Sequence, residues 1–232
     1  MQSASDYFDR IAAEYDDLIR RAVPVYELML QEFAIALPAD DGSIRRIVEL
    51  GAGTGNASVV LARAYPGAEL ILVDAGSDML DVAFARLGRE LPGRTGACLR
   101  RVERFEEVEF EAGSVDLVTS SIALHHVQDK AALFGRVLPW LRPGLQSGGE
   151  VVFLDQMAGA GPRTDAILRG RYREFCRANC TETEERELRK HEELHDHHEG
   201  LPAYLDALRA AGFRDVDCTW RTAMWAIVTG RA

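Results

Sequence analysis

The feature that most constrains this chain is a glycine-rich turn between a short apolar segment and a segment with helical spacing. Residues 46–50 read Arg-Ile-Val-Glu-Leu, and Gly51, Gly53 and Gly55 follow before the apolar-periodic stretch 57–64. Glycine lets the backbone take unusual angles there and lets a ligand approach without meeting a side chain. The exposed amides and the following helix N-terminus favour a carboxylate or a phosphate. The turn therefore predicts a strand, a ligand-binding loop and a helix, the first unit of an α/β fold.

Strand and helix patterns alternate along the first two thirds of the chain. Strands are predicted at 46–50, 70–74, 98–102, 115–120 and 150–154, with helices at 57–64, 77–87 and 130–141. This alternation predicts a parallel sheet with crossover helices on its faces. Ligands of such sheets bind beyond the carboxyl ends of the strands, so the residues just after each strand are the candidates for a site.

The two ends of the chain have different patterns. A three-four spacing of apolar residues predicts a helix from Asp6 that Pro24 interrupts, and further helices are expected over 25–37, 164–190 and 201–211. Two alternating segments, 216–220 and 224–230, predict an antiparallel hairpin at one edge of the sheet. We expect a single domain over 1–232, comprising a helical N-terminal cover (1–45), a ligand-binding core (46–155), a second helical cover (156–200) and a helix with the C-terminal hairpin (201–232).

Charge and cysteine use narrow the classes of partner. The formal net charge is −10, which argues against nucleic acid as the main partner, because such binders neutralise phosphates with a basic surface. The same balance argues against an anionic membrane surface, and no apolar run approaches the roughly 18–20 residues that cross a bilayer. The N-terminus shows no signal-peptide pattern, and the four cysteines form no CxxC motif. A cytoplasmic protein with reduced thiols is expected.

The turn departs from the dinucleotide-binding fingerprint. That fingerprint, GxGxxG, needs a third glycine where this chain has Asn56, so an NAD-dependent dehydrogenase is disfavoured. Asp74 ends the second predicted strand, where a carboxylate can accept both hydroxyls of a ribose. Taken singly, the turn could serve packing and Asp74 could cap the next helix. Together, in this order and on these elements, they favour a nucleoside-bearing ligand.

The segment 49–55, which reads ELGAGTG, resembles motif I of the class I S-adenosylmethionine-dependent methyltransferases. Residues 73–80 are similar to the family's VDxSxxML stretch, and 116–126 to the DLVxSxxxLHH segment of its small-molecule branch. The turn at 143–144 and the AGF sequence at 211–213 also match. The resemblance implies a Rossmann-like α/β fold, with a seven-stranded, mostly parallel sheet and an antiparallel C-terminal strand. It also implies S-adenosyl-L-methionine as the cofactor.

The resemblance implies a role for several residues around that cofactor. Glu49 would hold the methionine amino group, Asp74 the ribose, and Ala75 and Met79 would flank the adenine. The implied cofactor-binding set is Tyr15, Glu49, Gly51, Ala52, Gly53, Gly55, Asp74, Ala75, Met79, Glu103, Arg104, Phe105 and Ser120.

One position departs from the family pattern. Members often carry an Asp after the third strand that contacts the adenine amino group, and this chain has Arg104 there. Glu103 is adjacent and could substitute for that Asp, while Phe105 could cover the ring. The adenine contacts are therefore left open.

Methyl transfer from a sulfonium is an in-line displacement, so the protein mainly supplies alignment and desolvation. A general base is needed only when the acceptor must lose a proton. His125 and His126 follow the fourth predicted strand and face the expected pocket, so either is a candidate base or acceptor contact. The alternative is that one of them packs against or caps the following loop.

The segment 191–199, which reads HEELHDHHE, carries the other histidines. His191 and His195 have the four-residue spacing of metal ligands on a helix. A solvated, charged helix end is the favoured interpretation, and no metal is assigned. His198 is the first candidate in this segment for an acceptor contact made by a lid.

The N-terminal helices are expected to form the other half of the acceptor cover. In similar enzymes the FDxxAxxYD stretch, here 8–16, closes over the cofactor, with ordinary helix packing as the alternative. The side chains that could reach the pocket are Tyr7, Phe8, Tyr15, Arg20, Arg21 and Tyr26.

The function expected is S-adenosylmethionine-dependent methyl transfer to the oxygen, nitrogen or carbon of a small organic acceptor. Two alternatives stay open. One is an enzyme with the same cofactor and other chemistry, because residues 17–26 are faintly similar to the entry segment of carboxy-S-adenosylmethionine synthases. The other is a non-catalytic cofactor-binding module, because a fold does not dictate a function. The expected partner is the small-molecule acceptor, and a homodimer is left open.

Overall fold

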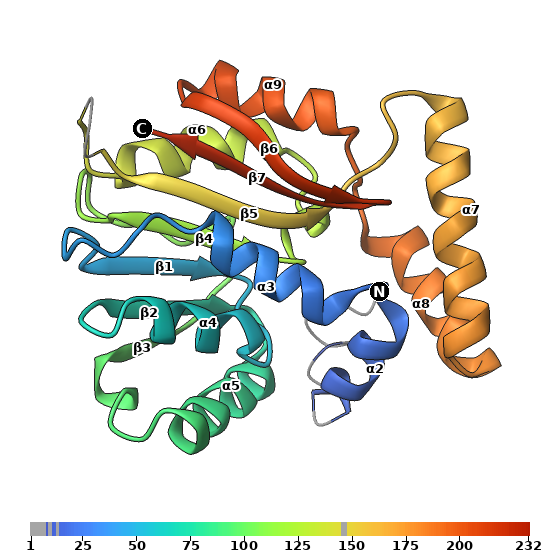
Figure 1. Cartoon of the computed structure of the whole chain (residues 1–232), viewed down its shortest axis with the longest axis horizontal. Helices are drawn as coiled ribbons and strands as arrows, with labels where there is room; N and C mark the ends of the chain where they lie inside the picture. Colours follow the sequence, from blue (N-terminus) through green and yellow to red (C-terminus); the bar gives the residue numbers. More distant parts are fainter. Residues whose placement is uncertain (1–7, 9–10, 13, 145–147) are drawn as a thin grey trace.

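The computed structural model describes residues 8, 11–12, 14–144 and 148–232. Its centre is a seven-stranded sheet in the order β3-β2-β1-β4-β5-β7-β6 (Figure 1). The first five strands run parallel, and β7 is antiparallel to both β5 and β6. This confirms the predicted sheet and its C-terminal hairpin. The strands are β1 (Arg46–Leu50), β2 (Glu69–Asp74), β3 (Cys98–Val102), β4 (Leu117–Ser121), β5 (Glu150–Gln156), β6 (Arg214–Thr222) and β7 (Trp225–Arg231).

Helices cover both faces of the sheet and its carboxyl-end edge (Figure 1). They are α2 (Tyr15–Ala22), α3 (Tyr26–Ala36), α4 (Asn56–Ala64), α5 (Ser77–Glu90), α6 (Lys130–Trp140), α7 (Pro162–Asn179), α8 (Glu182–His195) and α9 (Leu201–Ala211), with short 3-10 turns η1 (Thr95–Ala97) and η2 (Leu124–His126). The helix start predicted at Asp6 and the side chain of Tyr7 lie outside the described residues.

The strands carry apolar residues on both faces, and alternate residues pack into two separate hydrophobic cores, one on each face of the sheet. Ile47 and Leu72 belong to the cluster that includes side chains of α3, α4 and α5. Val48 and Ile71 belong to the cluster that includes side chains of α6 and α9. Successive strand residues point to opposite faces, so neighbours in sequence enter different cores. The near-continuous apolar composition of β1 and β2 is thus explained by burial on both faces.

The helices α2, α7 and α8 stand beyond the carboxyl ends of the parallel strands (Figure 1). They hold one another: Cys176 Sγ of α7 donates to the carbonyl of Ala22 at 3.6 Å, and Arg21 of α2 pairs with Glu184 of α8 at 2.5 Å. Segments far apart in the sequence therefore meet over the same edge of the sheet. That edge is where this fold class binds its ligands.

The single helix predicted over 164–190 is two helices. α7 ends at Asn179, and α8 begins behind Thr181 with a capping box. The Thr181 hydroxyl accepts from the Glu184 amide at 3.3 Å, and the Glu184 carboxylate accepts from the Thr181 amide at 2.8 Å. A Thr followed three residues later by Glu is the sequence signature of a helix start, so this break was readable from the sequence.

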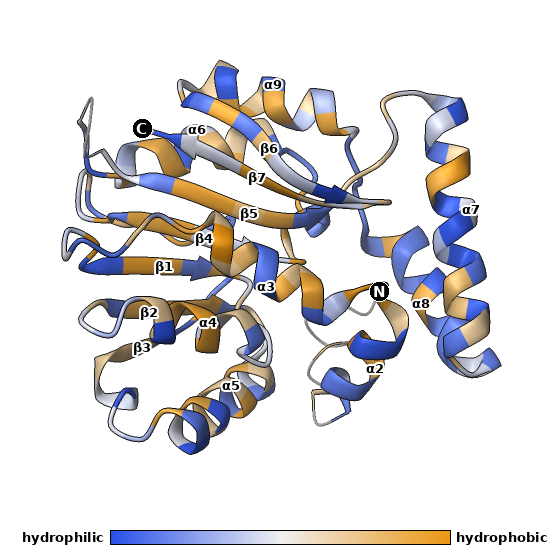
Figure 2. Ribbon diagram, in the orientation of Figure 1, coloured by the Kyte–Doolittle hydropathy of each residue, from blue (hydrophilic) through white to orange (hydrophobic). Residues whose placement is uncertain are grey.

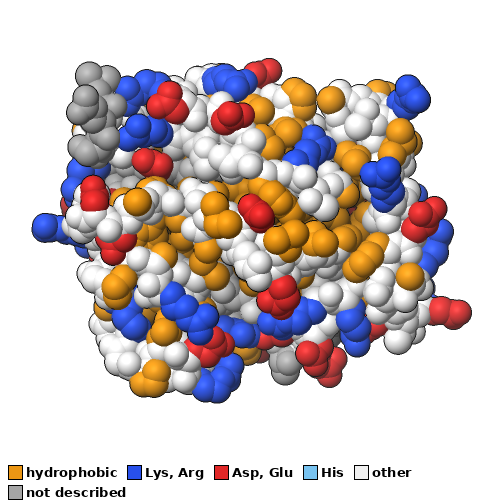
Figure 3. Space-filling model, in the orientation of Figure 1, with side chains coloured by type: hydrophobic (Ala, Val, Ile, Leu, Met, Phe, Trp, Pro, Cys, Tyr) orange, Lys and Arg blue, Asp and Glu red, His pale blue; other side chains and the backbone are white. Residues whose placement is uncertain are grey.

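The outer surface is mixed in character. Figure 2 shows hydrophobic central strands and a mainly hydrophilic α8. On the face seen in Figure 3, basic and acidic side chains surround a central apolar strip. Val25, Leu28 and Ile35, in and just before α3, are between 42% and 75% exposed. In the part of the chain that is described, no helix combines the length and apolar character that a membrane crossing requires.

Candidate functional site

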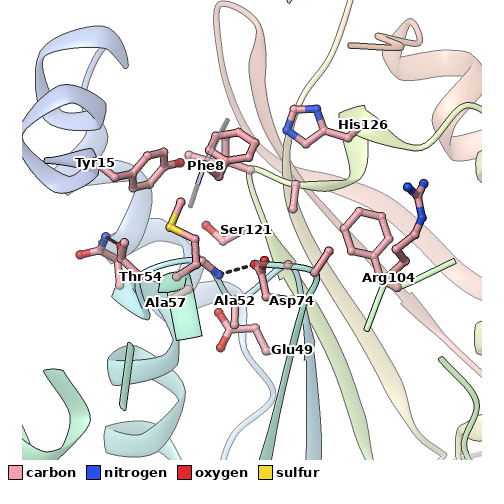
Figure 4. A pocket seen from close by; sticks show the side chains of 18 of the residues that line it. Phe8, Tyr15, Glu49, Ala52, Thr54, Ala57, Asp74, Arg104, Ser121 and His126 are labelled. Atoms are coloured by element: carbon pink, nitrogen blue, oxygen red, sulfur yellow. Dashed lines mark hydrogen bonds between the residues drawn. The ribbon is translucent and has the colours of Figure 1, made fainter. Parts of the chain in front are cut away.

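A cavity of about 330 Å³ lies at the carboxyl ends of β1, β2 and β4 (Figure 4). Its walls come from the glycine turn, the residues after β2 and β3, the start of α2 and the loops near η2 and α8. Of the residues predicted from the sequence, Tyr15, Glu49, Gly51, Ala52, Gly53, Asp74, Ala75, Met79, Arg104, Phe105 and His126 line it. Thr54, Asn56, Ala57, Glu106, Ser121, Ile122, Ala123, Leu194, His195 and His197 also line it and were not predicted as contacts.

Gly53 and Gly55 have different structural roles in the turn. Gly53 has φ +53°, and a Cβ built there would meet nothing within 4 Å, because the residue borders the cavity. Gly55 has φ +82°, and its Cβ would lie 2.9 Å from the Ala83 backbone in α5. Gly53 therefore keeps the backbone open to a ligand, whereas Gly55 permits close packing of α4 against α5. Gly55 does not line the cavity.

Asp74 ends β2 and organises the turn beside it. Its Oδ2 accepts the Gly53 amide and its Oδ1 accepts the Gly76 amide, each at 2.8 Å (Figure 4). A carboxylate oxygen has two lone pairs, so each oxygen of Asp74 can accept more than one hydrogen bond. Asp74 thus shapes the turn and presents an anionic acceptor at the same place.

Glu49 is buried at the floor of the cavity (Figure 4). Its Oε2 accepts from the Ser58 hydroxyl at 2.5 Å, while its Oε1 has no hydrogen-bond partner among the described residues. Burial raises the pKa of Glu49 to about 8, and the nearby charge of Asp74 adds to that rise. A buried carboxyl with one unsatisfied oxygen is unfavourable alone, so this position is suited to a cationic donor such as an ammonium group.

The residues after β3 divide between the cavity and the surface. Arg104 and Phe105 line the cavity, whereas Glu103 does not. Glu103 instead makes a two-oxygen contact with Arg101, at 2.7 and 2.8 Å. The structure therefore places Arg104 and Phe105, and not Glu103, beside any ligand of this cavity.

Neighbouring serines of β4 face opposite ways. The Ser120 hydroxyl donates to the Leu50 carbonyl at 2.8 Å and is buried away from the cavity. Ser121, one residue on, lines the cavity. The strand alternation explains why the motif residue chosen from the sequence is replaced at the cavity by its neighbour.

Asp16 ties the N-terminal cover to the glycine turn. It accepts from the Thr54 hydroxyl at 2.7 Å and from the Asn56 side-chain amide at 2.8 Å, and it pairs with Arg86 of α5. Burial opposes ionisation of Asp16, but these hydrogen bonds and the guanidinium of Arg86 outweigh it and lower its pKa. This anchor was missed, because nothing in the sequence shows that residues 38 and 40 positions downstream meet the same carboxylate.

A second cavity of about 70 Å³ adjoins the first. The two share Phe8, Tyr15, Ile122 and His126 in their walls. The remaining walls of the small cavity come from α2, α7, α8 and the end of β5, and include Ile19, Tyr172, Leu188 and Gln156. Most of these side chains are apolar, and both helical covers contribute to the wall of this cavity.

All six histidines of the chain gather at this edge of the sheet. His126 lines both cavities and His125 the smaller one, whereas His198 lines neither. His198 lies behind them, with its ring stacked on that of His125 at 5.5 Å. Asp196 is at the centre: its Oδ1 lies 3.0 Å from His126 Nδ1, and its Oδ2 lies 3.6 Å from His198 Nε2.

The pKa values of the clustered histidines and of Asp196 depend on one another's charges. Burial and the nearby His125 lower the pKa of His198 to about 3 and also lower the pKa of His126. Burial also opposes protonation of His125, but the charges of Asp196 and Asp155 outweigh it and raise its pKa. Burial would raise the pKa of Asp196, yet the surrounding histidines hold it below its ordinary value.

The predicted cover residues fall into two groups. Phe8, Tyr15 and Tyr26 line the large cavity. Arg20 and Arg21 point away from it, to Glu27 at 2.8 Å and to Glu184 at 2.5 Å. The aromatic side chains of the N-terminal cover thus border the site, while its arginines hold the cover together.

Comparisons with known proteins agree with this fold. Residues 47–144 match a family model described as a methyltransferase domain. The chain is 30% identical over 139 residues to the malonyl-[acyl-carrier protein] O-methyltransferase of Methylovorus sp. (strain MP688), a match covering 59% of this chain and 45% of that protein. The chain spans between 29% and 45% of the length of several curated relatives that it matches.

Solved structures of similar fold include two methyltransferases. One is phosphoethanolamine N-methyltransferase 2 of Haemonchus contortus, in complex with phosphomonomethylethanolamine and S-adenosylhomocysteine, with a TM-score of 0.65 and 21% identity over 92% of this chain and 44% of that one. The other is an S-adenosylmethionine-dependent methyltransferase of Thermotoga maritima, with a TM-score of 0.65 and 17% identity over 98% of both chains. At these identities the likeness establishes the fold.

Proposed function

We propose that the chain is a class I S-adenosylmethionine-dependent methyltransferase that transfers the methyl group of S-adenosyl-L-methionine to a small organic acceptor. The observation that carries the proposal is the pair of adjoining cavities at the carboxyl edge of the sheet. The large one has the size and the polar groups for the cofactor, and the small one is lined mainly by apolar side chains.

The residues of the large cavity fit the cofactor. The unsatisfied Oε1 of Glu49 is an acceptor for an amino-acid ammonium group, and its carboxylate form is favoured by such a partner. The open backbone at Gly53 leaves room for the ligand, and Asp74 offers its oxygens to ribose hydroxyls. Arg104 and Phe105 line the same cavity and are the residues that would contact the adenine. When bound, S-adenosylmethionine supplies an activated methyl group on a sulfonium.

The protein's part in the reaction is alignment and exclusion of water. Phe8, Tyr15, Ile122 and His126 form the shared wall between the two cavities, so an acceptor in the small cavity lies next to the donor cavity. Alignment of this kind can supply most of the rate enhancement of a displacement at carbon. The small volume favours an acceptor, or an acceptor end, of only a few heavy atoms.

His125 and His126 are the candidates for taking a proton from the acceptor. His125 Nδ1 lies 2.7 Å from Asp155 Oδ1, which orients the ring and supports a proton on it. His198 lies outside both cavities, and we propose that it acts through His125 rather than on the acceptor.

The proposal is tested by incubating the full chain with S-adenosylmethionine labelled in the methyl group and a panel of small hydroxy, carboxy, amino and phospho acceptors. We expect labelled product and S-adenosylhomocysteine in equal amounts. Mass spectrometry of the co-purified nucleotide separates the alternatives: a carboxylated cofactor would favour other chemistry. Tight cofactor binding without transfer to any acceptor would favour a binding module.

A further inference from the structure

We propose that His125, His126 and Asp196 form a binding site for one divalent transition-metal ion, of the zinc or cobalt type, in the wall of the small cavity. Each of the three can offer one ligand atom, and these atoms all lie within 4.8 Å of one another. Imidazole nitrogens and a carboxylate oxygen are the donor set of many such ions, which hold them at about 2.0–2.2 Å.

The geometry between His126 and Asp196 indicates that a further group, such as a cation, binds both side chains. His126 Nδ1 and Asp196 Oδ1 are 3.0 Å apart, yet neither atom has an aligned hydrogen bond among the described residues. The two atoms lie within ion-pair distance, but neither is satisfied by a hydrogen bond. Buried polar atoms in that situation are costly unless another group satisfies both of them, as a cation would.

A second layer of contacts holds the ligands in place. His125 Nδ1 is engaged by Asp155 at 2.7 Å, so Nε2 is the nitrogen that His125 can offer to an ion. A carboxylate behind a histidine is the usual support of a metal-bound imidazole. The loop with Asp196 is fastened to η2 and to α6: the His197 amide donates to the His125 carbonyl in η2, and Nζ of Lys130, the first residue of α6, donates to the His197 carbonyl, each at 2.6 Å.

The position of the site suggests its use. All three residues line the small cavity, and His126 also lines the donor cavity. An ion there would bind an oxygen or nitrogen of the acceptor and lower its pKa, so that the acceptor gives up its proton to solvent before attacking the methyl group. This role rests on the proposed function, whereas metal binding itself does not.

The test is titration of the full chain with Co²⁺ after treatment with a chelator, followed by visible absorption, with Zn²⁺ as competitor. We expect one ion per chain. His126→Ala and Asp196→Asn should each weaken binding about tenfold or more, and Asp155→Asn, which alters only the supporting carboxylate, by roughly tenfold. Circular dichroism checks that each variant is folded, and the near-isosteric Asp196→Asn keeps the test valid if His126→Ala unfolds.

Two controls identify adventitious binding. Glu193→Gln, at an exposed position of α8, should leave the affinity unchanged. If His195→Ala abolishes Co²⁺ binding while His126→Ala retains it, the ion sits on the helix end and the proposal is overturned. Absence of stoichiometric binding by the wild type would overturn it as well. Binding of S-adenosylhomocysteine is measured in the same samples, so loss of the metal site and failure of the methyltransferase assignment give separate signals.

Discussion

Asp16 of α2 accepts a hydrogen bond from Thr54 at 2.7 Å, so the N-terminal cover is fastened to the turn that borders the donor cavity. Asn56 and Arg86 contact the same carboxylate. The N-terminal cover and the glycine turn are therefore held together by the side chain of Asp16. A substitution at Asp16 should weaken cofactor binding although Asp16 itself does not line the cavity.

Asp16→Ala is expected to lower the free energy of unfolding by about 1–3 kcal/mol, because it leaves Thr54, Asn56 and Arg86 without their shared acceptor. Binding of S-adenosylhomocysteine should weaken roughly tenfold, because the turn and cover lose their link. Urea unfolding and titration calorimetry measure the two effects. Asp17→Ala, at an exposed position of the same helix, is the matched control and should change neither. Equal effects of both variants would contradict the anchoring role.

Glu49→Gln should change how stability depends on pH. The pKa of Glu49 is raised from 4.5 to about 8, so between these values the folded state binds more protons than the unfolded state. The contribution of Glu49 to stability is therefore lost as pH rises through this window. Relative to the wild type, ligand-free Glu49→Gln should gain about 1–2 kcal/mol between roughly pH 5 and pH 8. Urea unfolding at several pH values checks this, and a stability difference that stays flat would refute it.

Gly55→Ala should destabilise the fold by more than about 1 kcal/mol, because φ is +82° and the new Cβ would press on Ala83. Gly135→Ala is the matched control. It lies inside α6, its Cβ would meet nothing within 4 Å, and the change should stabilise the protein by roughly 0.5–1 kcal/mol. Thermal unfolding of both variants distinguishes them. A Gly55→Ala variant as stable as the wild type would show that α4 and α5 can separate at no cost.

Leu188→Trp should fill the small cavity and leave the donor cavity intact, because Leu188 lines only the former. We expect methyl transfer to fall about tenfold or more while the affinity for S-adenosylhomocysteine stays within roughly threefold. Leu28→Trp, on the exposed side of α3, is the control for the added bulk. If transfer is unaffected in Leu188→Trp, the acceptor binds elsewhere.

The sheet could be predicted from the sequence because each of its signals is local. The glycine turn, the apolar run ending at Asp74 and the hairpin at the C-terminus each depend on residues close together in the chain. The break between α7 and α8 also has a local signal, in Thr181 and Glu184, although the longer helical periodicity of the segment predicts one helix.

The site was predictable where it follows a strand end and not where it depends on packing. Asp74 ends β2, Arg104 and His126 lie in the segments that follow β3 and β4, and all three line the cavity. The choice between Ser120 and Ser121 depends on which face of β4 turns to the cavity, which one residue of register decides. The contact of Asp16 with Thr54 and the position of Asp196 among the histidines join segments far apart in sequence, which no local pattern reveals.

The most direct test of this account is calorimetric titration of S-adenosylhomocysteine into the wild type and Asp74→Ala, with Asp81→Ala on the surface of α5 as the control. We predict one-to-one binding in the micromolar range for the wild type and Asp81→Ala, and a loss of at least about thirtyfold in Asp74→Ala. Unchanged affinity in a folded Asp74→Ala, or no binding by the wild type, would contradict the assignment of the cofactor to this cavity.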